Sequence, residues 1–263
     1  MNTKNPIGIF DSGVGGTSIW KEIHSLLPFE NTLYLADSKY APYGNRTKED
    51  IIALSKKNTE FLLKKGCKII VVACNTATTN AIKELRESYE VPFIGIEPAI
   101  KPAALKSQTK NIGILATKGT LSSALFHETS KKFTKDTQIV EVVGEGLVAL
   151  IEKGNLKNPE ITRLLKQFLA PMLDANIDHL VLGCSHYPYL IPLLKSLLPK
   201  DVKIIDSGLA VAKQTQAILN SYALLQKEPI KPTLQFYTNS SKVALETLLA
   251  PYQEKTIIEE LFF

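Results

Sequence analysis

Short apolar runs alternate along this chain with longer segments in which apolar residues recur at helical spacing. In the first part of the chain, the apolar runs predict strands over residues 7–10, 32–36, 68–73 and 93–96. Residues 49–65 carry apolar side chains three and four positions apart, which predicts a helix between two of these strands. Such alternation is typical of α/β proteins, in which a mostly parallel sheet is covered by helices.

A similar series restarts in the middle of the chain. Its apolar runs predict strands over residues 111–115, 138–143, 179–182 and 202–205. One strand of each series ends in the same way, because VVACNT brings Cys74 to a strand end and VLGCSH brings Cys184 to another. The two motifs lie about one domain length apart, which indicates a weak internal repeat.

The repeat predicts a fold of two similar α/β lobes, each a mostly parallel sheet covered by helices. We expect residues 1–97 and 207–263 to form the first lobe and residues 98–206 to form the second. From residue 207 onward, a helix, a strand over 234–237 and a further helix are expected to pack on the first lobe. Ligands of open parallel sheets bind at the carboxyl ends of the strands, so the active site is expected in the cleft between the lobes.

The composition and the N-terminal residues indicate where in the cell we expect this protein. Hydrophobic residues make up 44% of the 263 residues, but no run approaches the roughly 18–20 apolar residues that span a bilayer. Residues 1–6 lead directly into the first predicted strand without the pattern of a signal peptide. We therefore expect a cytoplasmic protein with no membrane partner.

The net charge of +5 does not point to nucleic acid. The lysines are scattered in pairs among acidic residues, and the arginines are Arg46, Arg86 and Arg163. Proteins that read nucleic acids use arginine forks and a continuous basic face. Nucleic acid is therefore not an expected partner.

Three cysteines, Cys67, Cys74 and Cys184, are an odd number for a disulfide framework. No CxxC pair or histidine-rich tract supplies the usual spacing of zinc ligands, so we expect no metal. Cys67 directly precedes a buried strand and is expected to pack as a small apolar residue. Cys74 and Cys184 remain as candidates for chemistry.

The first predicted strand is followed by a glycine-rich turn, Asp11-Ser12-Gly13-Val14-Gly15-Gly16. Such a turn lets backbone N–H groups face an anion at a helix N-terminus. It lacks the third glycine of a dinucleotide fingerprint and the Gly-Lys-Ser/Thr of a P-loop. Because Asp11 would repel a phosphate, a substrate that carries both a carboxylate and an ammonium group fits this turn better.

Cys74 is followed by Asn75 and Thr76, and Cys184 by Ser185 and His186. A thiol at the end of a strand and the start of a helix has its thiolate stabilised. Two such thiols, one in each lobe, suit the inversion of a stereocentre, since one face of the carbon loses a proton and the other gains one. The residues therefore predict a racemase that needs no cofactor.

Two other classes of function remain open at this point. A Cys–His hydrolase needs only one cysteine with a histidine, and it leaves the second cysteine motif unexplained. A sensor that binds carboxylates would use the same loops without any turnover.

The motifs together resemble the glutamate racemase family. The resemblance rests on FDSGVGG at 10–16, PYG at 42–44, ACNTA at 73–77 and GCSHYP at 183–188, with further similarity at 116–120 and at Glu152. It covers nearly the whole chain in order and spacing. Aspartate racemases share the paired cysteines but carry Glu where His186 stands here, so aspartate racemase is the alternative within the family.

The resemblance implies interconversion of L- and D-glutamate without pyridoxal phosphate or metal, supplying D-glutamate for peptidoglycan. In this reading Cys74, assisted by Asp11, deprotonates D-glutamate. Cys184, assisted by His186 and Glu152, deprotonates L-glutamate. A homodimer is the family expectation. Ser185 departs from the family's usual threonine but keeps the hydroxyl group.

The resemblance also implies a set of substrate-binding residues, which would hold the amino and carboxyl groups of glutamate. They are Asp11, Ser12, Pro42, Tyr43, Gly44, Asn75, Thr76, Thr117, Thr120, Ser185 and His186.

Overall fold

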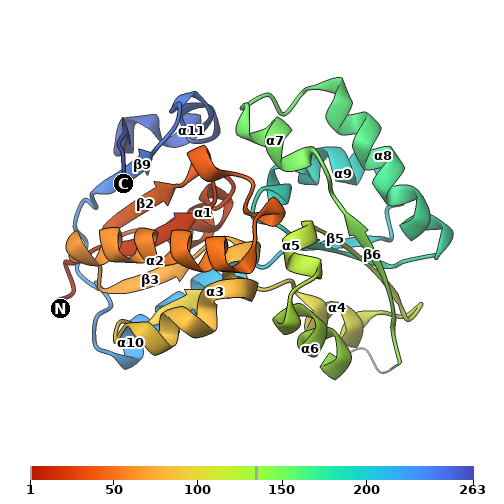
Figure 1. Ribbon diagram of the computed structural model, residues 1–263, viewed down its shortest axis with the longest axis horizontal. Coiled ribbons are helices and arrows are strands. Elements are labelled where there is room, and N and C mark those ends of the chain that lie inside the picture. Colours follow the sequence, from red (N-terminus) through yellow and green to blue (C-terminus); the bar gives the residue numbers. More distant parts are fainter. Residues whose placement is uncertain (1, 134–135) are drawn as a thin grey trace.

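The computed structural model describes residues 2–133 and 136–263 and contains two parallel sheets (Figure 1). The larger sheet has six strands in the order β10-β9-β2-β1-β3-β4. Its strands are β1 (Ile7–Asp11), β2 (Thr32–Ala36), β3 (Ile69–Val72), β4 (Phe93–Gly95), β9 (Leu234–Thr238) and β10 (Thr256–Glu260). The four central strands are buried along most of their length, which explains their apolar sequences.

Helices cover both faces of this sheet. They are α1 (Thr17–Leu26), α2 (Lys48–Lys64), α3 (Asn75–Ser88), α10 (Gly208–Ser221) and α11 (Val243–Leu248). One face packs against α1, α10 and α11 around Trp20, and the other packs against α2 and α3 around Leu62 and Leu85. The predicted helix over 49–65 is confirmed as α2, whose first turn is capped by the Thr47 hydroxyl accepting from the Asp50 N–H at 3.1 Å.

The smaller sheet has four strands in the order β6-β5-β7-β8. They are β5 (Asn111–Ala116), β6 (Gln138–Val143), β7 (His179–Gly183) and β8 (Lys203–Ile205). Its helices are α4 (Ile100–Lys106), α5 (Lys118–Leu121), α6 (Ala124–Phe133), α7 (Leu147–Glu152), α8 (Pro159–Asp174) and α9 (Ile191–Leu197). A core around Phe126 fills one face and a core around Leu165 and Leu194 fills the other. The predicted α/β architecture of two helix-covered parallel sheets is confirmed.

The chain passes from the larger sheet to the smaller one after β4 and returns after β8. Residues after Ser207 supply α10 and then β9, which pairs with β2 in parallel. The exact lobe boundaries, 97/98 and 206/207, stay a prediction. The prediction for the C-terminal part was incomplete, because the final strand β10 was not expected. β10 lies at the edge of the sheet with its residues partly exposed, so its sequence TIIEE lacks the apolar run of a buried strand.

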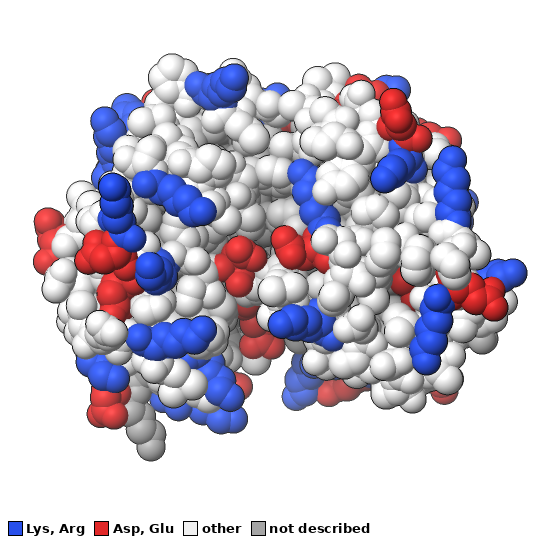
Figure 2. All heavy atoms as spheres, turned by 180° about the vertical axis from the view of Figure 1, so that it is seen from behind, with Lys and Arg blue, Asp and Glu red and all other residues white. Residues whose placement is uncertain are grey.

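The surface carries both signs of charge over both lobes. In the face drawn in Figure 2, Lys and Arg side chains are interspersed with Asp and Glu, and the surface is indented between the lobes. Within the two described stretches of the chain, none of the helices is both long and apolar enough to cross a bilayer.

Candidate active site

The carboxyl ends of four neighbouring strands bring the sequence motifs together. Asp11 ends β1, Cys74 follows β3, Thr117 follows β5 and Cys184 follows β7. A hydrogen bond joins the two lobes at this point, because the Ser185 hydroxyl donates to Asp11 Oδ1 at 3.0 Å. The glycine-rich turn and the two cysteine motifs, which are far apart in the sequence, therefore form one site.

Cys74 is the N-cap residue of α3 and is 4% exposed. Its Sγ accepts from the Ala77 N–H at 3.4 Å and lies 3.6 Å from the Ser12 hydroxyl. Burial, and next the Asp11 carboxylate, raise the pKa of the Cys74 thiol above its ordinary value. The Cys184 thiol raises it further as a smaller contributor, so the two sulfur atoms interact electrostatically across the site.

Asp11 is fully buried, and hydrogen bonds hold both of its oxygens. Oδ2 accepts the N–H groups of Gly13 and Gly16, each at 3.1 Å. Burial raises the pKa of Asp11, and the nearby His186 acts in the opposite direction. Asp11 thus fixes the glycine-rich turn and lies close enough to Cys74 to help raise the pKa of that thiol.

The glycines of the turn allow the second lobe to approach closely. A Cβ atom on Gly15 would lie 2.2 Å from His186 Nδ1, and one on Gly13 would lie 2.0 Å from Glu152 Oε1. The Val14 N–H donates to Glu152 Oε1 at 2.7 Å. The backbone of this turn therefore binds carboxylates of the protein itself, because the Val14 N–H donates to Glu152 and the Gly13 and Gly16 N–H groups donate to Asp11.

Cys184 is 5% exposed, and a series of polar contacts connects it through His186 to the partly exposed Glu152. Cys184 Sγ lies 3.7 Å from His186 Nδ1, and His186 Nε2 lies 2.5 Å from Glu152 Oε1. Burial lowers the pKa of His186, but its contacts with Cys184 and Glu152 outweigh burial and raise the pKa well above its usual value. The imidazolium form of His186 is therefore favoured, and it lies between a thiol and a carboxylate.

Glu152 connects both lobes. It comes from the end of α7, and its Oε2 accepts from the Ser38 hydroxyl of the larger lobe at 2.8 Å. Ser38 was not found from the sequence, because no motif marks a serine that contacts a residue more than a hundred positions away. Two further contacts between the lobes were missed for the same reason: Ser18 Oγ donates to the Ser185 carbonyl at 2.7 Å, and Thr17 shares a hydrogen bond with Tyr189 at 2.6 Å.

Three threonine hydroxyls form a cluster across the cleft. Thr76 Oγ1 lies 2.8 Å from Thr117 Oγ1 and 3.3 Å from Thr120 Oγ1, and the latter two are 3.0 Å apart. Gly44 packs against this cluster, since a Cβ atom there would lie 3.0 Å from Thr117 Cβ. The predicted substrate-binding residues Thr76, Thr117, Thr120 and Gly44 are thus neighbours.

The Tyr43 side chain does not join the thiols. It is 1% exposed, and its hydroxyl donates to Asp37, which also accepts from Asn58 and Asn239. Tyr43 therefore anchors the turn of Pro42 to Asn45 to the larger lobe.

Asn75 has a buried side chain, 2% exposed, whose amide makes no hydrogen bond within the described chain. A buried amide without partners costs free energy, and binding sites commonly retain such groups for a ligand. Asn75 directly follows Cys74, so its amide is available at the site.

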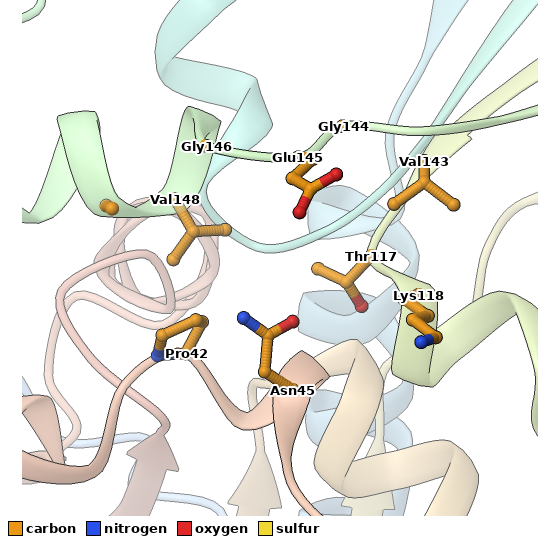
Figure 3. Close-up of a pocket in the computed structure, with 10 residues that line it drawn as sticks. Pro42, Asn45, Thr117, Lys118, Val143, Gly144, Glu145, Gly146 and Val148 are labelled. Atoms are coloured by element: carbon orange, nitrogen blue, oxygen red, sulfur yellow. The ribbon is translucent and has the colours of Figure 1, made fainter.

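A cavity of about 400 Å³ opens between the lobes next to the threonine cluster (Figure 3). The turn with Pro42 and Asn45 forms one wall, and the segment from Val143 to Ala149 forms the opposite wall. Thr117 and Lys118 line it from the second lobe. The cavity reaches the hydroxyl cluster, so it offers a way into the site.

Each of the two parallel sheets has a cysteine at the end of one strand, and hydrogen bonds connect these two regions between the lobes. This arrangement is that of an amino-acid racemase. The family model described as Asp/Glu/Hydantoin racemase matches residues 7–215. The chain belongs to this family.

Similar proteins within the family are glutamate racemases. One from Ectopseudomonas mendocina is 47% identical over 229 residues, which are 87% of each chain. A crystal structure of a Bacillus anthracis glutamate racemase covers 100% of this chain and 99% of its own, with 30% identity and a TM-score of 0.89. The Escherichia coli glutamate racemase in complex with L-glutamate and an activator has 32% identity, covers 98% of both chains and gives a TM-score of 0.85.

Proposed function

We propose that this enzyme interconverts L- and D-glutamate by proton exchange between the substrate's α-carbon and two opposed thiols. The observation that carries the proposal is that the glycine-rich turn contacts both cysteine motifs, because the Ser185 hydroxyl donates to Asp11 at 3.0 Å and Cys74 Sγ lies 3.6 Å from the Ser12 hydroxyl. Each thiol comes from a different sheet, so a substrate between them meets a base on each face. The Escherichia coli relative in complex with L-glutamate supports glutamate as the substrate.

Cys74 is proposed to remove the α-proton of D-glutamate, with Asp11 beside it. Cys184 is proposed to remove the α-proton of L-glutamate, with His186 and Glu152 beside it. The contact of 3.7 Å between Cys184 and His186 supports this, because an imidazolium stabilises a neighbouring thiolate. In each direction, the thiol opposite the attacking thiolate returns a proton.

The proposed binding mode uses polar groups rather than arginine. The α-ammonium would approach Asp11, which neutralises a buried carboxylate and removes a cause of the raised pKa of Cys74. The carboxylates would accept hydrogen bonds from a set of amide, hydroxyl and backbone donors. This set is Ser12, Pro42–Gly44 (through Tyr43 and Gly44), Asn75, Thr76, Thr117, Thr120, Ser185 and His186.

The free amide of Asn75 supports this binding mode. An amino acid's α-proton is far less acidic than a thiol, so the developing carbanion must be stabilised as it forms. Preorganised donors around the α-carboxylate provide that stabilisation best in a site closed to water. The burial of both thiols supports such a closed state.

We propose further that the enzyme works in the cytoplasm as a homodimer, uses no cofactor and supplies D-glutamate for peptidoglycan. A bacterial strain that requires D-glutamate tests the cellular role, since expression of this chain should restore its growth.

The reaction is tested by incubating the protein with L-glutamate in D2O without added cofactor. The expected result is D-glutamate that carries deuterium at the α-carbon. Parallel reactions with L-aspartate compare the two acids, and a higher kcat/KM for aspartate would overturn glutamate as the substrate. Folded protein that produces no α-exchange with either acid would overturn the racemase mechanism.

The cysteine variants separate this mechanism from a Cys–His hydrolase. Cys74→Ala and Cys184→Ala should each abolish racemisation, because each thiol supplies one face. A hydrolase would lose turnover only with Cys184→Ala. Cys67→Ala is the matched control, because this third thiol is buried in the core of the larger lobe and should leave racemisation intact.

A further inference from the structure

A second cavity lies at the opposite end of α1 from the glycine-rich turn, and it has a volume of about 240 Å³. Its walls come from the last turn of α1, from β9 and from the segments that lead into β9 and β10. The lining residues are His24, Pro28, Lys231, Pro232, Leu234 and Lys255. The cavity shares no lining residue with that of Figure 3, and we call it the His24 cavity.

Every lining residue of the His24 cavity that can carry charge is basic. Lys231 and Lys255 come from two different segments, and neither forms an ion pair within residues 2–133 and 136–263. His24 Nδ1 is buried and has no hydrogen-bond partner in the described chain. Two ammonium groups and an imidazole around one cavity attract an anion, because no carboxylate among the lining residues balances their charge.

A hydroxyl group near the His24 cavity also lacks a partner. Thr256 directly follows Lys255 and pairs in register with Leu234 of β9. Side chains alternate along a strand, so Thr256 lies on the same face of β10 as Ile258, which packs on the α1 side of the sheet. The Thr256 hydroxyl is buried and makes no hydrogen bond to the described residues. Binding sites commonly retain such polar groups for a ligand.

Ring contacts hold the His24 side chain in place at the cavity. His24 stacks on Trp20, with ring centroids 5.1 Å apart and an angle of 6° between the planes. Tyr252 contacts the His24 ring edge-on at a centroid distance of 6.1 Å. The imidazole is therefore preorganised, and a ligand would lose little affinity in ordering it.

The charges around His24 disfavour its protonated form while the cavity holds no anion. Burial, and next the charge of Lys255, lower the pKa of His24. Lys231 lines the same cavity, and Lys21 of α1 lies on the Tyr252 ring with its Nζ 6.0 Å from the centroid. A bound anion would oppose the effect of these ammonium groups and favour the imidazolium.

We propose that the His24 cavity binds a small phosphate monoester. Lys231, Lys255 and the imidazolium of His24 would bind the phosphate group through charge-assisted hydrogen bonds. The two prolines and the leucine of the lining supply an apolar wall for the organic part of the ester. The cavity is smaller than the about 300–1,000 Å³ of sites for drug-sized ligands, which restricts the ligand to a small molecule.

The sole tryptophan of the chain, Trp20, reports the charge of His24, because a stacked imidazolium quenches tryptophan emission more strongly than a neutral imidazole. The pH titration of this emission is recorded in sodium chloride and in sodium sulfate at equal ionic strength, since sulfate stays a dianion throughout. Sulfate should raise the pKa of His24 by about one unit, which corresponds to about tenfold tighter binding to the imidazolium form. NMR of the His24 Cε1 proton, assigned by its absence in His24→Gln, follows the same titration.

Calorimetry then compares phenyl phosphate with inorganic phosphate. The ester should bind several-fold more tightly, because its ring covers the apolar wall. Lys231→Gln and Lys255→Gln should each weaken binding of the ester several-fold. Lys255→Gln should also raise the pKa of His24 in sodium chloride, since Lys255 lowers it. Lys166→Gln is the matched control, because it removes an exposed lysine from α8 in the other lobe and should leave binding unchanged.

Three results would overturn the site or its ligand. An equal pKa of His24 in the two salts would show that no dianion binds beside it. Equal loss of binding in all three lysine variants would reduce the effect to the net charge of the protein. Tighter binding of inorganic phosphate than of the ester would refute the monoester as the ligand. None of these measurements involves turnover, so each result is independent of the proposed racemisation.

Discussion

The contact between His186 and Glu152 gives the most demanding test of the site, through the variant Glu152→Gln. The replacement keeps the size of the side chain and one oxygen that can accept from the Val14 N–H or the Ser38 hydroxyl. It removes the negative charge that lies 2.5 Å from His186 Nε2. The perturbation is therefore electrostatic and leaves the packing between the lobes in place.

The size of the effect follows from the charges. Two unit charges whose centres lie about 4 Å apart interact by about 4 kcal/mol at an effective dielectric constant of 20. A hydrogen bond to a charged group contributes about 1.5–3 kcal/mol, and the glutamine side chain retains part of it. We take about 1.5–3 kcal/mol as the loss of stabilisation of the imidazolium, which corresponds to about a 10- to 150-fold decrease in kcat/KM.

The assay follows racemisation in both directions by circular dichroism or by chiral chromatography. The two enantiomers have equal free energies in water, so kcat/KM for L- and D-glutamate must fall by the same factor. The pH profile supplies a second readout. Glu152 helps to raise the pKa of His186, so Glu152→Gln should lower that pKa and move the alkaline limb of kcat/KM to lower pH.

A Glu152→Gln enzyme with kcat/KM within twofold of the unmodified enzyme and an unshifted pH profile would refute this reasoning. The matched control is Glu128→Gln, which removes a carboxylate from the exposed side of α6. The control should change neither the rate nor the profile.

Three further variants test the fold and the binding mode. Lys68→Met should lower the unfolding free energy by about 3–5 kcal/mol, measured in urea, because it leaves Glu30 buried without its partner at 2.5 Å. Gly15→Ala should lower kcat about 100-fold, since its Cβ displaces His186 from Cys184. Asn75→Ala should raise KM about 10-fold or more at nearly unchanged thermal stability, because its amide bonds no protein group within the described chain.

Each of these variants has a matched control. Lys56→Met removes an exposed pair with Glu84 and should cost at most about 1 kcal/mol, so an equal loss in both lysine variants would contradict the buried pair. Gly208→Ala mainly meets the flexible Glu22 side chain and should keep full activity. Asn80→Ala loses hydrogen bonds to two carbonyls and should lower the melting temperature, whereas a similar loss in Asn75→Ala would contradict a free amide.

Much of the fold was predictable because buried parallel strands have a strong local pattern. Val71, for example, lies in a continuous apolar run, which is typical of a strand that is covered on both faces. The structure places this run in β3, where every residue is buried. The edge strand β10 was not predictable in this way. Its pairing with β9 depends on backbone hydrogen bonds, which any side chains allow, and its exposed positions carry Ile257, Glu259 and Glu260.

The candidate site was predictable where it lies on strand ends, since parallel strands bring Asp11, Cys74 and Cys184 to the edges that face the cleft. Glu152 could be found only through resemblance, because a glutamate at the end of a short helix usually faces solvent. Ser38 could not be found at all. Its hydrogen bond to Glu152 depends on how two separately folded sheets are packed together, and no local pattern in the sequence encodes that packing.

The burial of the two thiols at the candidate site also affects how long the enzyme survives in its surroundings. Cys74 and Cys184 are 4% and 5% exposed, so peroxides and alkylating reagents have little access to them while the lobes are packed as in this structure. The rate of chemical inactivation therefore reports any local or global opening that exposes these two sulfur atoms. Glutamate bound between the two thiols would cover them further, so a saturating supply should lengthen the working life of each enzyme molecule under oxidative stress.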